Sequence, residues 1–199
     1  MTAKATRMTA AERREQILDV TKELVDERGF HAVSIEAVAR RAGITRPVVY
    51  THFNDLSGLL EALVAREGER ALQQLSLLLP ADLSGENRRD VLTRAMRSYL
   101  EAVAADPITW RLVLMPPEGA PELLRTGIAR GREMIVAQLA EVARPGIVPG
   151  RASPDPELTG WTLSSLSDAA ARLLLTDPER WTVERLMAHT EWLLDQLAS

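Results

Sequence analysis

The sequence predicts an all-α protein, and three of its features lead to that prediction. Aromatic residues make up only 4% of the chain, whereas alanine and leucine are plentiful, which favours helices over sheets. Apolar residues recur three and four positions apart along most of the chain. No segment alternates apolar and polar residues as a half-buried strand would. We therefore expect about nine helices, arranged as a small N-terminal bundle (residues 1–54) and a larger helical domain (residues 55–199).

The first helix is expected to begin at Thr9 and to end just before Gly29. Thr9 and Glu12 have capping-box spacing, in which each side chain bonds the backbone N–H of the other residue. Apolar residues then follow at helical spacing from Ile17 to Val25. Gly29 is a residue type that commonly follows the last turn of a helix.

Two short helices separated by a glycine turn are expected next, over Ile35–Ala42 and Arg46–Phe53. Ser34 and Thr45 can cap them with their hydroxyl groups. Gly43 supplies the left-handed residue that the turn between them needs. These are the requirements of a helix-turn-helix, a motif whose second helix enters the major groove of DNA.

The larger domain is expected to begin with a long helix, which must run from the N-terminal bundle into the body because it spans on the order of 35 Å. A polar loop then precedes the remaining helices. The expected helices of this domain are about Leu56–Leu79, Arg88–Ala105, a short one carrying Trp110, Pro121–Ala143, Glu157–Leu175 and Pro178–Ala198.

Composition excludes several classes of protein. The chain has no cysteine, which excludes a disulfide scaffold, a thiol nucleophile and a cysteine-ligated metal. No apolar run approaches the roughly 18 residues needed to cross a membrane. Residues 1–7 lack the apolar core of a signal peptide. We therefore expect a cytoplasmic protein without a membrane partner.

Charge is distributed unevenly along the chain, whose net charge is −4. Residues 1–54 hold 9 Lys and Arg against 7 Asp and Glu, whereas residues 55–199 hold 15 against 21. A mildly basic N-terminal segment on an acidic body suits a protein that meets phosphate at one end. Chance segregation of the charges is the alternative.

Over Ile17–Leu63 the chain resembles the tetracycline-repressor (TetR) family of bacterial transcriptional regulators. The resemblance is carried by S-I-E-A-V-A at residues 34–39, A-G-I at residues 42–44 and V-Y-T-H-F at residues 49–53. It implies a homodimer that binds double-stranded DNA with its first three helices, and a small molecule with the others. The expected function is a ligand-responsive regulator, most simply a repressor released from a palindromic operator by a small, mostly apolar effector.

The resemblance also implies which residues face DNA. Arg46 is the first choice for reading a base, since a guanidinium can bond both major-groove acceptors of guanine. Val48 and Thr51 could touch a thymine methyl group, and Tyr50 and His52 could hold phosphates. The expected DNA-binding residues are Ser34, Thr45, Arg46, Pro47, Val48, Tyr50, Thr51 and His52. Where the family usually has a lysine, this chain has Leu56, which puts one phosphate contact in doubt.

The last two helices carry more apolar and small residues than a helix lying on one neighbour needs, which predicts a four-helix dimer interface. The alternative is that both helices complete the core of their own subunit. The expected interface residues are Leu166, Ala170, Leu173, Val183, Leu186, Met187, Thr190, Leu193, Leu194 and Leu197.

A mostly apolar effector pocket is expected between the helices of the larger domain. Its aromatic residues and methionines could also be ordinary core. Asp168 and Arg172, four residues apart, could orient a ligand or simply pair with each other. The expected ligand contacts are Met96, Tyr99, Trp110, Met115, Ile128, Trp161, Ser165, Asp168 and Arg172.

Two other classes of function are weighed against a regulator. An enzyme is disfavoured, because the chain has only three histidines and no nucleophile elbow, phosphate-cradling glycine loop or zinc-binding histidine pair. No metal and no cofactor are expected. A helical adaptor that keeps the fold without binding DNA is the other alternative, and Leu56 is the residue that favours it.

Overall fold

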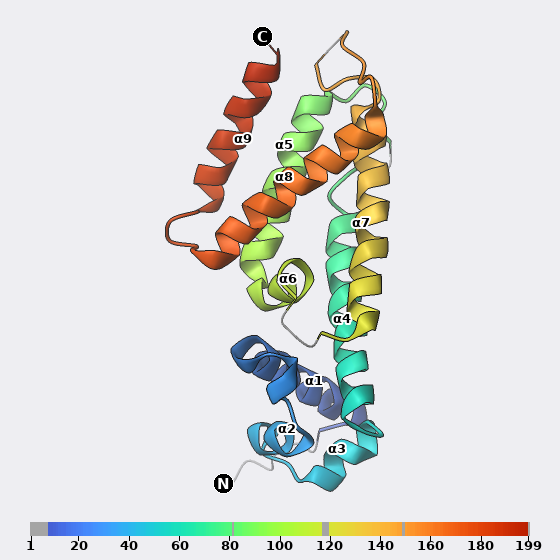
Figure 1. Ribbon diagram of the computed structural model, residues 1–199, viewed down its shortest axis with the longest axis vertical. Coiled ribbons are helices and arrows are strands. Elements are labelled where there is room, and N and C mark those ends of the chain that lie inside the picture. The colour runs from blue at the N-terminus through green and yellow to red at the C-terminus, as the bar shows by residue number, and fades with distance from the viewer. Residues whose placement is uncertain (1–7, 81, 117–119, 149, 199) are drawn as a thin grey trace, which may run out of the picture.

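The computed structural model describes residues 8–80, 82–116, 120–148 and 150–198, with side chains placed up to Gln196. Residues 1–7 and the side chain of Leu197, both used in the sequence predictions, lie outside this description. The described residues form nine α-helices and one short 3₁₀ helix, and they contain no β-strand (Figure 1). The all-α prediction is therefore confirmed. No helix of the described part is long and apolar enough to cross a membrane.

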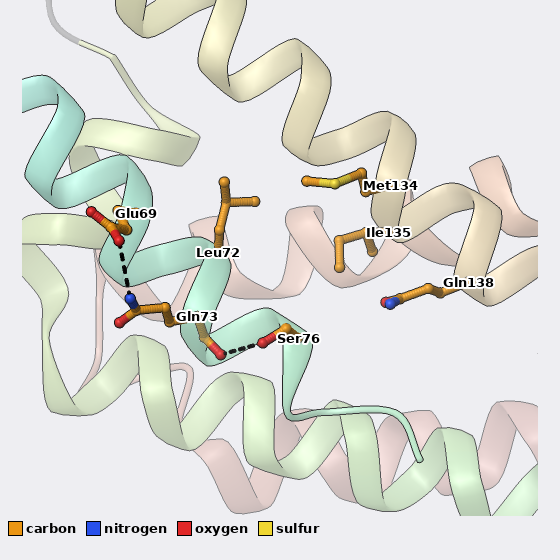
Figure 2. A pocket seen from close by; sticks show the side chains of 7 residues that line it. All are labelled: Glu69, Leu72, Gln73, Ser76, Met134, Ile135 and Gln138. Atoms are coloured by element: carbon orange, nitrogen blue, oxygen red, sulfur yellow. Dashed lines mark hydrogen bonds between the residues drawn. The ribbon is translucent and has the colours of Figure 1, made fainter. Parts of the chain in front are cut away.

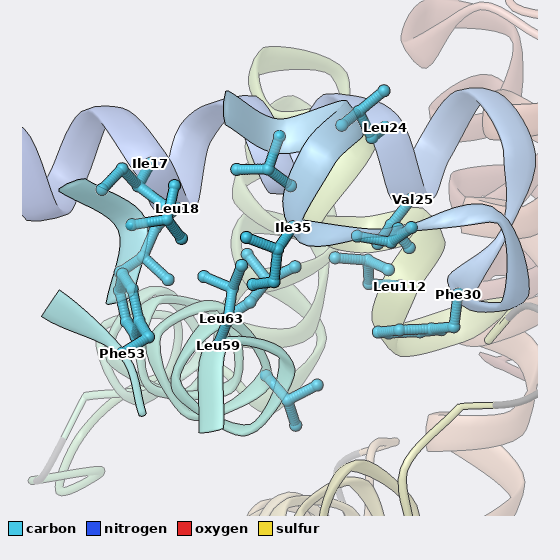
Figure 3. Packing of buried hydrophobic residues seen from close by; sticks show 14 of the residues in the cluster. Ile17, Leu18, Leu24, Val25, Phe30, Ile35, Phe53, Leu59, Leu63 and Leu112 are labelled. Carbon is cyan, nitrogen blue, oxygen red and sulfur yellow. The ribbon is translucent and has the colours of Figure 1, made fainter. Parts of the chain in front are cut away.

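The N-terminal bundle consists of three α-helices and a 3₁₀ turn that surround one apolar core. Figure 3 shows this core, in which side chains of the bundle meet Leu59 and Leu63 from the next helix and Leu112 from the body. The first part of the long fourth helix is thus part of the same core. The helices are α1 (Ala10–Arg28), η1 (Phe30–Ala32), α2 (Ile35–Ala42) and α3 (Arg46–His52).

Local sequence signals account for most helix ends in the bundle. Thr9 and Glu12 form both bonds of the capping box, and the Ser34 hydroxyl accepts the N–H of Ala37. Gly43 has φ 66°, a left-handed conformation that glycine adopts without strain.

The capping expected of Thr45 was wrong. Thr45 is at the N-cap of α3, but its side chain makes no capping bond. A capping hydroxyl accepts from the second or third residue of the helix. Here the second is Pro47, which has no N–H, and the N–H of the third, Val48, bonds the backbone carbonyl of Thr45 at 3.0 Å.

Six helices follow the bundle, and Figure 1 shows α4 running from the bundle into the body beside α7. The remaining helices pack around these two, with α8 crossing α7 and α9 lying against α5. The helices are α4 (Leu56–Ser76), α5 (Arg88–Ala105), α6 (Pro107–Leu114), α7 (Glu122–Ala143), α8 (Pro156–Thr176) and α9 (Val183–Ala198).

Two predicted helix ends differ from the structure by more than one residue. The long helix ends at Ser76 rather than Leu79, because the last N–H groups turn to carbonyls three residues back and a proline follows at residue 80. The last helix begins at Val183 rather than Pro178. The residues from Asp177 form only one turn, and the Thr182 hydroxyl then caps the helix proper by accepting the N–H of Arg185.

The small residues of α8 serve a different neighbour from the one expected. A Cβ added at Gly160 would lie 2.5 Å from the carbonyl oxygen of Val136, so α8 touches the backbone of α7 in its own subunit. Ser164 and Ala171 are buried in the same subunit. Close approach of helices therefore occurs here, but within the subunit.

Candidate DNA-binding surface and effector cavity

Helix α3 presents one face to the core and the other to solvent. Val49 is completely buried, Phe53 directly after the helix is buried as well, and both pack with α1 and α4. Of the predicted DNA-binding residues on this segment, Thr45, Arg46, Pro47, Tyr50 and Thr51 are exposed, and Val48 and His52 are half-buried. All seven residues of this segment are therefore at least partly accessible to solvent, at the end of the molecule opposite α9 (Figure 1).

Arg46 differs from the other arginines near this surface. Arg41 is held by Glu27, at 2.7 Å, and by Glu23, at 3.5 Å, while Arg40 lies 4.0 Å from Glu36. Arg46 has no ion pair or hydrogen bond with any described side chain. It therefore keeps all its donors for an external acceptor.

Three further positions refine the surface. The Thr51 hydroxyl donates to the Pro47 carbonyl at 2.9 Å, which leaves its methyl group for an apolar contact. Ser34 is exposed at the start of α2, where its hydroxyl already accepts a backbone N–H.

Leu56, at the position of the family's lysine, is half-buried against the bundle core, and Asp55 caps α4 beside it. Leu56 therefore packs and cannot reach a phosphate.

A buried polar network joins α1 to α4 and α6, and the sequence analysis did not anticipate it. The Lys22 ammonium lies 3.0 Å from Glu67 and 2.9 Å from Asp106, and it donates to the Thr109 hydroxyl at 2.6 Å. The Thr109 hydroxyl is also within hydrogen-bonding reach of both carboxylates. Glu67 and Thr109 are completely buried. The sequence did contain a signal for this network, because Lys22 and Glu67 each interrupt an apolar helical stripe.

The carboxylates of this network are held ionised by their partners. Burial alone would raise the pKa of Glu67, but hydrogen bonds from Thr109 and Lys22 and the Lys22 charge outweigh it, so the pKa lies below its usual 4.5. The same balance lowers the pKa of Asp106. Around this centre, Arg66 of α4 lies 2.8 Å from both Glu15 and Asp19 of α1. The position of α1 is thus tied to that of α4 by charge.

A cavity of about 1000 Å³ lies among α4, α5, α6, α7, α8 and α9. Its lining is mainly leucine, isoleucine, valine and alanine, with a few hydroxyl side chains. Three helix-interior glycines contribute to it, and a Cβ added at Gly68 or Gly127 would meet no atom within 4 Å. The third, Gly131, leaves room for the Leu72 side chain, which would lie 2.9 Å from an added Cβ. Missing side chains therefore help to keep this space open.

One cluster of polar side chains in the lining is joined by hydrogen bonds. Asp168 of α8 accepts hydrogen bonds from Arg132 of α7 at 2.6 Å and from the phenol of Tyr99 of α5 at 3.4 Å. Burial raises the pKa of Asp168 and, together with the Asp168 charge, that of Tyr99. Tyr99 is therefore a neutral donor, and its ring lies edge-on to Trp110 at 5.1 Å.

The predicted ligand contacts divide into two groups. Met96, Tyr99, Trp110, Ile128 and Asp168 line the cavity. The other four do not line it, which corrects the prediction. Met115, Trp161 and Ser165 are exposed, because each lies on the side of its segment that faces away from the cavity. Arg172 lies behind Asp168, 3.8 Å away, and its Nε donates to the carbonyl of Leu114. The prediction missed Arg132, since nothing in the sequence pairs it with residue 168.

A second, smaller hollow of about 300 Å³ lies on the outside of the seam between α4 and α7. Figure 2 shows Leu72 of α4 facing Met134 and Ile135 of α7 across it. Glu69, Leu72 and Ile135 also line the large cavity. At this seam only a layer of side chains separates the cavity from solvent.

The outer faces of α8 and α9 expose large apolar side chains, which is the feature that the dimer prediction requires. Leu166 and Leu173 of α8 are 57% and 39% exposed, and Leu193 of α9 is 38% exposed. Ala170, Val183 and Thr190 are half-buried. Trp161 and Trp192 are also exposed on these helices and were not predicted to be in an interface.

Three predicted interface residues are placed differently. Met187 is only 1% exposed and belongs to the core formed with α5, α6 and α8, and Leu186 is buried in the same core. Leu194 is buried against the cavity. Their positions on the apolar stripe of α9 are explained by packing against α5, so the prediction that they lie on a surface was wrong.

Known proteins share both the sequence of the N-terminal bundle and the whole fold. A sequence model described as "Bacterial regulatory proteins, tetR family" matches residues 17–63. The "HTH-type transcriptional regulator BetI" of Serratia proteamaculans is 30% identical over 136 residues, which cover 66% of this chain and 68% of that protein.

Two solved structures show the fold. A TetR-like transcriptional regulator from Rhodococcus sp. RHA1 has a TM-score of 0.76 at 24% identity, over 96% of this chain and 97% of the other. The transcriptional regulator FadR from Bacillus subtilis, in complex with stearoyl-CoA, has a TM-score of 0.66 at 18% identity, over 93% and 97%.

Proposed function

We propose that this chain, which belongs to the tetR family of bacterial regulatory proteins and is a helix-turn-helix transcriptional regulator, represses its target genes as a homodimer. In this proposal the dimer binds a palindromic operator through α3 and leaves it when a small, mostly apolar effector enters the cavity. The observation that carries the proposal is the pairing of an exposed α3, on which Arg46 has no partner among the described side chains, with a large apolar cavity at the other end of α4.

The roles of the α3 residues follow from their exposure. Arg46 has both branches of its guanidinium free for the edge of a guanine, the commonest specific contact in the major groove. Tyr50 and His52 lie further along the same segment, where their polar tips can meet phosphates and fix the register of the helix on DNA. Because Leu56 packs inward, the phosphate contact of the family's lysine is absent from this chain.

Dimerisation is proposed through the outer faces of α8 and α9. A soluble chain rarely leaves several large apolar side chains exposed together, and here Leu166, Leu173 and Trp192 are exposed on these two helices. Leu166 and Leu173 also line the cavity. A second copy would therefore cover the exposed residues and close one side of the cavity in a single step. It would also supply the second α3 that successive major grooves, about 34 Å apart, require.

Helix α4 is proposed to carry the effect of the ligand to DNA. Gly68 and Leu72 of α4 line the cavity, and Glu67, one residue earlier, is bound to Lys22 of α1. A ligand that displaces this turn of α4 must move or break the buried network, and so change how the bundle is held. The ligand shifts the equilibrium only by the difference between its affinities for the two conformations.

An apolar effector is supported by the chemistry of the lining. FadR, which has the same fold, was solved with stearoyl-CoA, a molecule with a long apolar chain. The cavity of this chain offers about 1000 Å³ of mainly aliphatic surface, the size and character of sites that enclose small molecules.

Binding to DNA from beside the protein's own gene tests the regulator. In a fluorescence anisotropy titration at low salt, we expect one fragment to bind more tightly than unrelated DNA of the same length, and the difference to persist as salt is raised. If no upstream fragment binds better than unrelated DNA, the repressor is excluded. The alternative, a helical adaptor that keeps the fold without binding DNA, is then favoured. Leu56 agrees with that alternative, because it stands where the family usually has a lysine.

Analytical ultracentrifugation tests the dimer. Leu166→Arg should convert a dimer into monomers, because it places a charge in the centre of the proposed apolar interface. Leu77→Arg is the matched control, since Leu77 is 85% exposed but lies at the end of α4. A Leu166→Arg protein that sediments as the unchanged protein does would rule out this interface.

A further inference from the structure

The polar cluster at the cavity holds more guanidinium groups than carboxylates, and this imbalance indicates the kind of ligand that fits. Asp168 is the one carboxylate within 4.0 Å of Arg132 and Arg172 among the described residues. Two guanidinium groups thus share one carboxylate, and the cluster has a net charge of +1. This charge lies beside an apolar cavity, where electrostatic attraction is stronger than in water.

The donors of Arg132 are only partly used. Its Nη2 bonds Asp168, and the described residues give its other nitrogens no hydrogen bond. A guanidinium can hold a carboxylate through two parallel bonds, so Arg132 can keep Asp168 and accept a second acid. Arg132 lines the cavity, whereas Arg172 is turned toward the carbonyl of Leu114.

Asp168 is not free to bind a cationic ligand. It already accepts from Arg132 and Tyr99 and lies 3.8 Å from Arg172. A ligand cation would have to displace one of these donors inside the protein. Glu69 is the other carboxylate of the lining, but it is exposed at the rim, where water screens it, and it accepts a hydrogen bond from Gln73.

We infer that the effector is an amphipathic acid: one carboxylate-like group bound by Arg132, joined to an apolar chain or ring system that fills the aliphatic part of the cavity. The inference rests on the proposed function only in taking this cavity as the effector site. Arg132 sets the preference for an acidic head group, and Asp168 and Tyr99 hold the guanidinium in place.

Three probes with the same twelve-carbon chain test the inference: dodecanoate and dodecyltrimethylammonium, each below its critical micelle concentration, and dodecanol, below its solubility limit. Binding is measured by isothermal titration calorimetry on the full chain. We expect dodecanoate to bind about tenfold or more tightly than dodecanol, as a charge-assisted bidentate pair provides, and the cation to bind least. Dodecanol that binds as tightly as dodecanoate, a cation that binds most tightly, or no binding of any probe would each overturn the inference.

Variants of two arginines on α7 test whether Arg132 causes the preference for dodecanoate over dodecanol. Arg132→Gln should bring the affinity for dodecanoate down to that for dodecanol and leave dodecanol nearly unchanged. Arg132→Lys, which keeps the charge, should retain part of the preference. Arg130→Gln is the control, because Arg130 is exposed on the same helix and does not line the cavity. Equal weakening of all three probes by Arg132→Gln would show a loss of structure rather than of recognition, and would overturn the assignment.

The same protein samples separate this inference from the proposed function. Selective binding of upstream DNA without any preference for dodecanoate would retain the regulator and reject the acidic ligand. A preference for dodecanoate that depends on Arg132, in a protein that selects no DNA, would retain the ligand class and reject the regulator.

Discussion

The bundle and the body use their apolar residues in different ways. In the bundle, Val38 and Val49 are completely buried in a continuous core, and the residues assigned to DNA lie on the outside of that core. In the body, the helices leave about 1000 Å³ open between them, and five of the nine residues assigned to the ligand line that space. The bundle therefore packs its apolar residues into a filled core, whereas the body leaves part of its apolar surface around an open cavity. The Lys22–Glu67 network joins the two.

Removing a charge from the junction is expected to have the largest effect. Glu67→Ala leaves the Lys22 ammonium buried with only one carboxylate, and breaking such a pair costs about 3–5 kcal/mol. Glu69→Ala, two residues along the same helix, changes an exposed side chain and should alter stability by less than about 0.5 kcal/mol. Urea unfolding followed by circular dichroism measures both. Equal stability of the two variants would mean that the network does not hold the bundle to the body.

Replacing glycine with alanine should change the free energy of unfolding in opposite directions at two positions. Gly160→Ala should lower the free energy of unfolding by about 1–3 kcal/mol, because the new Cβ meets the backbone of α7. Gly127→Ala should raise it by up to about 1 kcal/mol, since the added methyl group meets nothing and alanine favours the helix. Thermal unfolding compares them. A stabilising Gly160→Ala would contradict the close contact between α7 and α8.

Two arginine substitutions compare the proposed DNA-facing side of the bundle with the rest of its surface through their effects on operator affinity. Arg46→Ala should weaken operator binding by about 1–3 kcal/mol and relax the preference at one base pair. Arg41→Ala should change affinity far less, because Arg41 is already held by Glu27 and Glu23. Fluorescence anisotropy against the operator and its single-base variants measures both. If Arg46→Ala binds every sequence as before, then Arg46 reads no base.

The pH dependence of stability should differ in sign between the junction and the cavity. The pKa values of Glu67 and Asp106 are lowered in the folded state, so their contributions are complete above about pH 4.5 and are lost as the pH falls through the folded values. The pKa of Asp168 is raised, so its protonation favours the folded state as the pH falls.

Urea unfolding at a series of pH values between 3 and 7 measures these small effects. Glu67→Gln should make the loss of stability in acid shallower, whereas Asp168→Asn should make it steeper. Curves that are parallel for the three proteins would contradict the assigned directions.

The sequence predicted which side chains around α3 are accessible to solvent better than which side chains line the cavity, for a physical reason. The exposure of Arg46 and Tyr50 depends on the phase of one short helix, which local signals such as Ser34 and Gly43 define. The cavity depends on which side chains of six helices fail to fill a common space, and no local spacing specifies that. For this reason Tyr99 and Asp168 were found through residue type, whereas Trp161 was misplaced.

Local sequence patterns could not predict the long-range polar contacts either. Lys22 and Glu67 each signalled a buried charge by interrupting an apolar stripe, but their pairing spans 45 positions in the sequence. Met187 shows the converse limit. Its place on the apolar stripe of α9 was compatible with a dimer interface or with the core of its own subunit, and only the packing of α9 on α5 decides for the core.

The measurement that tests the central claim most directly is the affinity for operator DNA with and without a ligand in the cavity. With dodecanoate at saturating concentration, below its critical micelle concentration, we predict that the dimer binds the operator about 5- to 150-fold more weakly, the usual range for coupled sites. By reciprocity, the operator should weaken dodecanoate binding by the same factor. Operator affinity that stays the same while dodecanoate is shown to be bound would contradict the account.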